Sequence, residues 1–216
     1  MKKAIIFDLD GTLLNTLPDI TDHINCAFKE YGLKEMSITE VRNFVSLPVE
    51  YLIEQASGYK QGTSEYKKVF DKYIEYAEDI NSYHHLGFFE DIPCVITELK
   101  KRGYLLFILT NKSYEEAMGI KDIYLKDYPF DEIVTQMPGV PTKPDPTSTI
   151  NLLKRYEISP ENAFFVGDGE TDVLAGLRAK TNLVAVLWGN RDRDFLESYG
   201  ATVFAEKPLD LLKIIP

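Results

Sequence analysis

The sequence AIIFDLDGT, residues 4–12, begins with four apolar residues and continues into two acids one residue apart, Asp8 and Asp10. A continuous apolar run is typical of a strand that is buried on both faces, as in a parallel sheet. Carboxylates held this close repel each other and lose hydration free energy when they are buried. We therefore expect either a nearby cation or exposure to water to compensate them.

Further short apolar runs predict the rest of a sheet. Clear strands are expected at residues 104–109 and 163–166, and weaker ones at 183–187, 201–204 and 133–134. Helical patterns lie between them, for example at residues 95–102, 148–156 and 171–179. Strands that alternate with helices indicate an α/β fold, a doubly wound, Rossmann-like parallel sheet covered by helices on both faces.

The chain between the first two predicted strands is far longer than one crossover helix requires. Helical periodicity fills most of it, at residues 18–31, 39–44, 49–56 and 66–80. We therefore expect a small helical cap at residues 16–82, inserted into a core formed by residues 1–15 and 83–216. The alternative is that these helices simply pack on the surface of the main sheet.

Composition restricts the partners and the location. The 216 residues carry a formal net charge of −10, so we expect no nucleic acid and no acidic membrane surface as a partner. No apolar stretch is long enough to span a bilayer. Cys26 and Cys94 fit no metal-binding or redox spacing, which favours reduced thiols in a cytoplasmic protein. The sequence does not indicate an oligomeric state.

Polar residues gather where the predicted strands end, which is where ligands bind in a sheet of this kind. Asp8 and Asp10 follow the first strand. The other candidates follow later strands or, for the lysine, lie between prolines: Thr110, Asn111, Lys143, Asp168 and Asp172.

These residue types suit one chemical task. Asp8 with Asp168, either alone or joined by Asp172, would form an oxygen-rich site for Mg²⁺, a hard cation that binds through one or two carboxylates. The spacing of Ser113 and Glu116 predicts a capping box, which would leave backbone amides free at a helix start. Together with a lysine, such groups fit the attack of a carboxylate on a phosphoryl group.

Four ordered motifs resemble those of the haloacid dehalogenase-like superfamily, in its phosphoglycolate phosphatase-like branch. They are DLDGTL at residues 8–13, TNK at 110–112, KPDP at 143–146, and GD at 167–168 with Asp172. The resemblance covers nearly the whole chain. It implies a doubly wound core under a mobile helical cap, and hydrolysis of a small phosphorylated metabolite.

The resemblance also implies a role for each site residue. Asp8 would be the nucleophile that becomes an aspartyl phosphate, and Asp10 the general acid and base. Thr110 and Lys143 would hold the phosphate of the substrate, and Asn111 would also belong to the substrate-binding residues. The ligands of Mg²⁺ would be the Asp8 carboxylate, the main-chain carbonyl of Asp10, and Asp168, with Asp172 either a further ligand or a partner of Lys143.

Other functions of the same residues stay open. A β-phosphoglucomutase-like phosphomutase would bring an arginine in the cap, but residues 42–48 have no arginine after Val45. A pyrophosphatase of the same superfamily is a second alternative. A signalling module that stores a phosphoryl group on an aspartate is a third, although it would need neither Asp10 nor the large insertion.

Simple structural interpretations apply to several other residues. We expect Lys112 to be a surface charge. The adjacent His84 and His85 are expected in an exposed linker, because neighbouring residues rarely face the same way. The aromatic stripe at residues 66–80 is expected to pack in a core.

Overall fold

The computed structural model describes residues 2–45, 47–136 and 138–216, and its core is a six-stranded sheet. The order across the sheet is β3-β2-β1-β4-β5-β6, and every pairing between neighbouring strands is parallel. The strands are β1 (Ala4–Phe7), β2 (Leu105–Leu109), β3 (Glu132–Val134), β4 (Ala163–Gly167), β5 (Asn182–Val186) and β6 (Phe204–Ala205). The predicted α/β fold with a parallel sheet is confirmed.

Strand β1 lies inside the sheet because both of its faces are apolar. It pairs with β2 and with β4, so that Ile6 lies between Phe107 and Phe165. Ile5 and Phe7 pack toward one face, and Ala4 and Ile6 pack toward the other. This position brings the residue after Phe7 to the carboxyl edge of the sheet, between the ends of two other strands.

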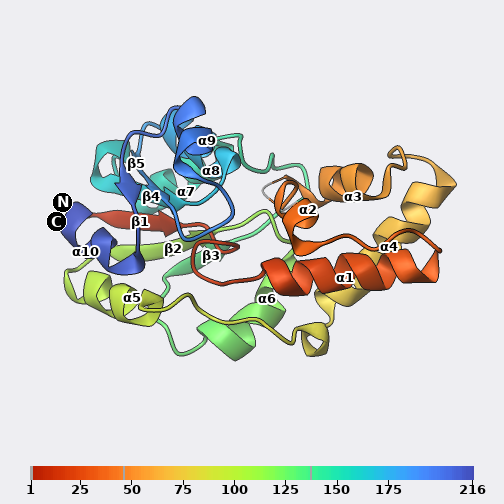
Figure 1. The fold of residues 1–216 in the computed structure, drawn as a ribbon. Helices are drawn as coiled ribbons and strands as arrows, with labels where there is room; N and C mark the ends of the chain where they lie inside the picture. Colours follow the sequence, from red (N-terminus) through yellow and green to blue (C-terminus); the bar gives the residue numbers. More distant parts are fainter. Residues whose placement is uncertain (1, 46, 137) are drawn as a thin grey trace.

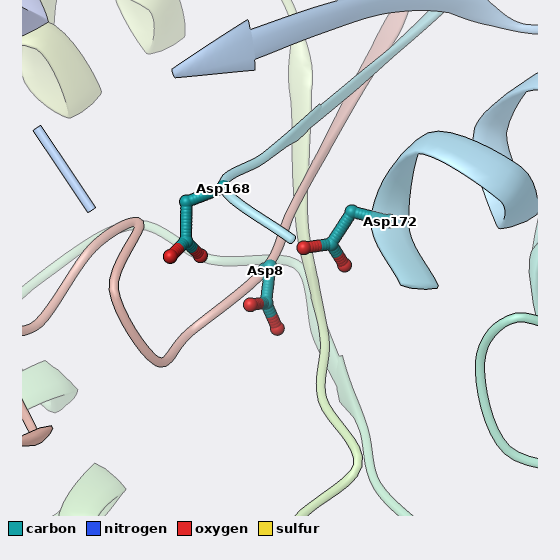
Figure 2. Close-up of side chains that lie close together, drawn as sticks. All are labelled: Asp8, Asp168 and Asp172. Carbon is teal, nitrogen blue, oxygen red and sulfur yellow. The ribbon is translucent and has the colours of Figure 1, made fainter. Parts of the chain in front are cut away.

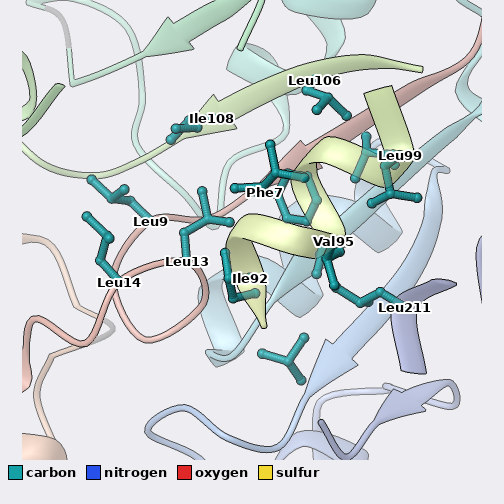
Figure 3. Close-up of a cluster of buried hydrophobic side chains, with 14 of the residues drawn as sticks. Phe7, Leu9, Leu13, Leu14, Ile92, Val95, Leu99, Leu106, Ile108 and Leu211 are labelled. Atoms are coloured by element: carbon teal, nitrogen blue, oxygen red, sulfur yellow. The ribbon is translucent and has the colours of Figure 1, made fainter. Parts of the chain in front are cut away.

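Helices cover both faces of the sheet. Helices α5 (Ile92–Lys101) and α10 (Leu211–Ile214) pack on the face that Phe7 contacts, as Figure 3 shows for Val95, Leu99 and Leu211. The opposite face is covered by α7 (Thr147–Tyr156), α8 (Glu170–Arg178) and α9 (Arg193–Ser198). Tyr104 connects the start of the described chain to its end at one edge of this core, because Lys3 Nζ lies over its ring and its Oη donates to the Pro216 carbonyl (Figure 1).

Four helices stand apart from the sheet, at the right of Figure 1. They are α1 (Leu17–Glu30), α2 (Ile38–Arg42), α3 (Val49–Ser57) and α4 (Ser64–Glu78). Their buried apolar side chains form a hydrophobic cluster of their own, to which Tyr66 and Tyr73 belong. The predicted packing role of this aromatic stripe is therefore confirmed. The exact division into a core and a cap at residues 16–82 stays a prediction.

Short elements complete the chain. Helix α6 (Tyr114–Ile120) continues into a π-helical turn at Lys121–Leu125, and single turns of 3₁₀ helix lie at Ile80–Ser82, Pro160–Asn162 and Pro208–Asp210. Within the described ranges, no helix combines the length and the apolar composition that a membrane span needs.

The last predicted strand is displaced. The apolar run at residues 201–204 predicted a strand, but β6 begins only at Phe204. Gly200 has a φ of 103°, and the Ala201 N–H donates to the Leu196 carbonyl at 3.1 Å, so these two residues form the turn that follows α9. The left-handed glycine ends the helix here, and the turn that follows it shortens the predicted strand to its last residues.

The packing of α5 on the sheet leads to a stability prediction. Leu99 has no exposed surface, so Leu99→Ala should lower the free energy of unfolding by about 2 to 5 kcal/mol, through lost burial and a residual cavity. Urea denaturation followed by circular dichroism measures this. Leu177→Ala, at a position that is 41% exposed, is the matched control and should change stability by about 0.5 kcal/mol or less. Equal losses in both variants would contradict the assigned core.

Candidate active site

Three carboxylates meet at the carboxyl ends of β1 and β4. Asp8 follows β1, and its N–H donates to the Val166 carbonyl of β4 at 2.9 Å. Asp168 follows β4, and Asp172 lies in the first turn of α8. One oxygen atom from each of the three lies within 4.8 Å of the other two, and all three residues are buried (Figure 2). The sequence prediction that these acids converge is confirmed.

Lys143 supplies the positive charge of this cluster. Its Nζ contacts Asp8 Oδ1 and lies 2.8 Å from Asp172 Oδ1. Of the two roles expected for Asp172, the partnership with Lys143 is therefore observed. Asp172 Oδ2 also accepts a hydrogen bond from the Gly169 N–H at 3.0 Å.

Asn111 fixes the main chain of that lysine. Its Oδ1 accepts a hydrogen bond from the Lys143 N–H at 3.0 Å, and its Nδ2 donates to the Lys143 carbonyl at 3.1 Å. These two bonds give the Asn111 side chain a positioning role, and its predicted part in substrate binding stays a prediction. Thr110 is buried beside it at the end of β2, and its Oγ1 accepts a hydrogen bond from the Lys112 N–H at 3.2 Å.

The acidic cluster carries unbalanced negative charge. Burial and the neighbouring Asp172 raise the pKa of Asp8 well above its ordinary value, although Lys143 acts in the opposite direction. Burial and Asp172 also raise the pKa of Asp168 to about 7. A divalent cation would reverse both shifts, because it favours the charged form of each carboxylate. The donor set, three buried carboxylates, suits a hard ion such as Mg²⁺.

Asp168 is held in place by residues that the sequence analysis did not single out as ligands or supports. Its Oδ1 accepts a hydrogen bond from Thr12 Oγ1 at 3.0 Å. Its Oδ2 accepts two more from Asn190, from the main-chain N–H at 2.7 Å and from Nδ2 at 2.9 Å. The signal for Thr12 was its place directly after Asp10 and Gly11, and Asn190 lies shortly after the strand predicted at residues 183–187.

Gly11 allows this close approach. It has a φ of 78°, and a Cβ atom there would lie 2.3 Å from Asp168 Oδ2. No side chain fits at that distance, and the positive φ is itself unfavourable for other residues. The glycine between Asp10 and Thr12 therefore lets the loop after β1 fold against Asp168.

A second cluster of charged and polar side chains, Lys112, Glu116 and Tyr83, lies beside Asp10. Lys112 Nζ lies 3.3 Å from Asp10 Oδ1 and pairs with Glu116 Oε1, which also accepts a hydrogen bond from Tyr83 Oη at 2.6 Å. Burial alone would lower the pKa of Lys112, but the carboxylates of Asp10 and Glu116 hold it above its ordinary value. Asp10 Oδ1 is buried and accepts no hydrogen bond within the described residues, so the Lys112 ammonium at 3.3 Å is its charged neighbour.

Two expectations are corrected here. Lys112 is not a surface charge: it is 7% exposed, because its side chain, from the loop before α6, contacts Asp10 and Glu116. The capping box at Ser113 is only half formed. Ser113 Oγ accepts from the Glu116 N–H at 3.2 Å, but the Glu116 carboxylate is engaged by Lys112 and Tyr83.

The histidine pair lies in an exposed stretch, as predicted. The main-chain N–H groups of His84 and His85 both donate to Asp19 Oδ1, at 2.7 and 2.9 Å, which ties this linker to α1. Trp188 stabilises the loop after β1, because its Nε1 donates to the Thr12 carbonyl at 3.0 Å.

The sequence of this chain is similar to those of known proteins. Residues 5–186 match the family model described as haloacid dehalogenase-like hydrolase. A phosphoglycolate phosphatase of Aquifex aeolicus is 33% identical over 99% of this chain and 96% of its own length. A pyrophosphatase PpaX of Bacillus cereus is 30% identical over 98% of this chain and 95% of its own length.

The fold of this chain is also similar to those of solved structures. A haloacid dehalogenase-like family hydrolase of Streptococcus pneumoniae superposes with a TM-score of 0.85 at 26% identity, over 100% of this chain and 99% of that one. A protein of Lactobacillus delbrueckii subsp. bulgaricus superposes with a TM-score of 0.90, also at 26% identity and over 100% and 99% of the two chains. The chain therefore belongs to the haloacid dehalogenase-like hydrolases, as a phosphatase of that family.

Proposed function

We propose that the protein is a Mg²⁺-dependent phosphatase that hydrolyses a small phosphomonoester through an aspartyl phosphate on Asp8. The observation that carries the proposal is the environment of the Asp8 carboxylate. It lies at the end of β1 with the Lys143 ammonium on one oxygen and with Asp168 and Asp172 within the reach of a shared metal ion. A carboxylate in this setting can approach an anionic phosphate, which it would otherwise repel by about 4 kcal/mol per charge pair.

In the first step, an Asp8 oxygen attacks phosphorus and the bond from phosphorus to the ester oxygen breaks. Asp10 donates a proton to the departing oxygen, so that the product leaves as an alcohol. Lys143 stabilises negative charge on the phosphoryl oxygens, and Asn111 holds the lysine in position. Thr110 is the further candidate for a hydrogen bond to the phosphate.

In the second step, Asp10 accepts a proton from water as the water oxygen attacks the phosphorus of the aspartyl phosphate. The bond between phosphorus and the Asp8 oxygen breaks, which restores the Asp8 carboxylate and releases inorganic phosphate. Asp10 ends the cycle protonated, ready for the next ester.

Asp8, Asp168 and the main-chain carbonyl of Asp10 would hold Mg²⁺. When bound, the ion neutralises charge on the carboxylates and on the phosphate. Thr12 and Asn190 orient Asp168 for this role. Asp172 pairs with Lys143 and accepts a hydrogen bond from the Gly169 N–H. Its negative charge would neutralise the lysine and would attract the ion without binding it directly.

Residues 16–82 are proposed as the cap that covers this site. Arg191 of the core reaches across to them: its guanidinium donates to the main-chain carbonyls of Arg42 at 2.6 Å and Asn43 at 3.0 Å, and pairs with Glu170 of α8. We propose that the cap opens and closes by breaking and forming these hydrogen bonds to carbonyl oxygens. This movement would admit substrate and release product.

The names of the relatives supply two test substrates, phosphoglycolate and pyrophosphate. The cytoplasm is the proposed location, and the free cysteines at positions 26 and 94 support it. A phosphomutase or a phosphoryl-storing signalling module stays an alternative. Phosphate release from a panel of phosphorylated metabolites tests the proposal against both, because a mutase forms isomers and a storage module turns over once.

Metal removal gives the first functional prediction. Excess chelator should abolish phosphate release, and Mg²⁺ should restore it, because the unbalanced carboxylates repel the substrate. Asp168→Asn should weaken the activation by Mg²⁺ at least about tenfold, since it removes a proposed ligand. Asp122→Asn, which removes a carboxylate at an exposed position directly after α6, is the control for the same change in net charge. Full activity in chelator would remove the metal from the proposed mechanism.

Asp8→Asn should abolish turnover while the fold stays intact. The amide is nearly isosteric with the carboxylate but cannot form the acyl phosphate. Phosphate release and mass spectrometry of the acid-quenched protein measure the effect, and circular dichroism checks the fold. A rate near that of the unmodified enzyme would mean that water, not Asp8, attacks phosphorus.

Asp10→Asn should separate the two steps. With an alkyl phosphate the rate should fall by about 10² to 10⁴, because the alkoxide leaves without a proton. An aryl phosphate with an acidic phenol needs no such help, so it should give a rapid burst of phenolate followed by slow hydrolysis of the phosphoenzyme. Stopped-flow absorbance measures the burst. Equal slowing of phosphoenzyme formation for both esters would leave Asp10 with a positioning role only.

A further inference from the structure

A second cavity lies next to the one that holds the acidic cluster. The two share Asp10, Val45 and Asn111, so a substrate bound through its phosphate at Asp8 would extend past Asp10 into the second cavity. That space is where the leaving group must lie, because Asp10 has to reach the ester oxygen. The chemistry of its walls therefore selects the alcohol part of the substrate.

The side of this cavity formed by the cap is mainly apolar. Helix α1 contributes Ile20, helix α3 contributes Val49 and Leu52, and helix α4 contributes Tyr73 and Ile74. None of these side chains carries a charge that could meet an anion. A carboxylate or a second phosphate placed against them would lose its hydration without gaining a partner.

The core side of the cavity offers no spare positive charge. Lys112 is the one cation among the described residues that line it, and two carboxylates, Asp10 and Glu116, line it as well. Lys112 already contacts both of them. The one ammonium on this side of the cavity is therefore already paired with carboxylates.

We infer that the enzyme prefers phosphomonoesters whose leaving group is small, apolar and uncharged, and discriminates against those whose leaving group is an anion. This inference rests on the proposed phosphatase function and specifies its substrate class. It sets the chain apart from what the names of its relatives suggest, since glycolate and phosphate, the leaving groups of phosphoglycolate and pyrophosphate, are both anions. Discrimination would come from repulsion and lost hydration in the cavity, while the phosphate site itself treats the esters alike.

Two nearly isosteric esters test the inference on the unmodified holoenzyme. Isobutyl phosphate carries an isopropyl group where phosphoglycolate carries its carboxylate. With Mg²⁺ saturating, kcat/KM should be at least about tenfold higher for isobutyl phosphate than for phosphoglycolate, and pyrophosphate should be as poor as phosphoglycolate. Equal or better cleavage of phosphoglycolate or pyrophosphate would overturn the inference while the phosphatase function stands. If no ester is cleaved, an aryl phosphate included, both fail.

A charge placed in the apolar wall provides the second arm. Ile74 is half-buried on α4, and Ile74→Lys should shift the ratio of kcat/KM by about tenfold toward phosphoglycolate. Ile150→Lys makes the same change on α7, at a position 46% exposed that does not line this cavity, and should leave the ratio unchanged. The same ratio in all three proteins would contradict the placement of the leaving group in this cavity.

Discussion

Mutual repulsion among three buried carboxylates is the constraint around which this site is organised. Asp8, Asp168 and Asp172 present oxygen atoms within 4.8 Å of one another, and Lys143 is the ammonium that contacts two of them. One positive charge does not balance three negative ones, which is why burial and proximity raise the pKa values of Asp8 and Asp168. The remaining imbalance favours a divalent cation and, with it, an anionic substrate.

The fold supplies the rigidity that holds like charges together. Strands β1 and β4 are neighbours whose side chains are buried on both faces, so the residues that follow them cannot move apart without disturbing the core. Gly11 then lets the first loop pass within contact of Asp168, and Thr12 and Asn190 supply the hydrogen bonds that the carboxylate needs. The packing of the sheet therefore offsets the electrostatic repulsion between the carboxylates.

The group around Asp10 joins this core to the helical insertion. Tyr83, in the linker that returns from the insertion, donates to Glu116, and Glu116 pairs with Lys112 beside Asp10. Arg191 makes a second connection through the main chain at Arg42 and Asn43. Polar contacts thus connect the two parts on the core side, while the apolar faces of α1, α3 and α4 limit the space beyond Asp10. In the proposed function, the core therefore carries the reacting groups, and the inserted helices select the leaving group.

The sequence by itself determined the alternation of strands and helices, the inserted helices and the acids at the strand ends. Those features depend on local periodicity, and the carboxyl ends of parallel strands must share one edge of the sheet. Tertiary structure decided what depends on contacts between distant segments. Lys112 looked like a surface charge until α6 buried it against Asp10 and Glu116, and Asn111 turned out to hold Lys143 across 32 residues. Asn190 reached Asp168 only because β4 and β5 are adjacent. Burial and pairing belong to the folded chain, because a side chain's partners are fixed by packing and not by its neighbours in sequence.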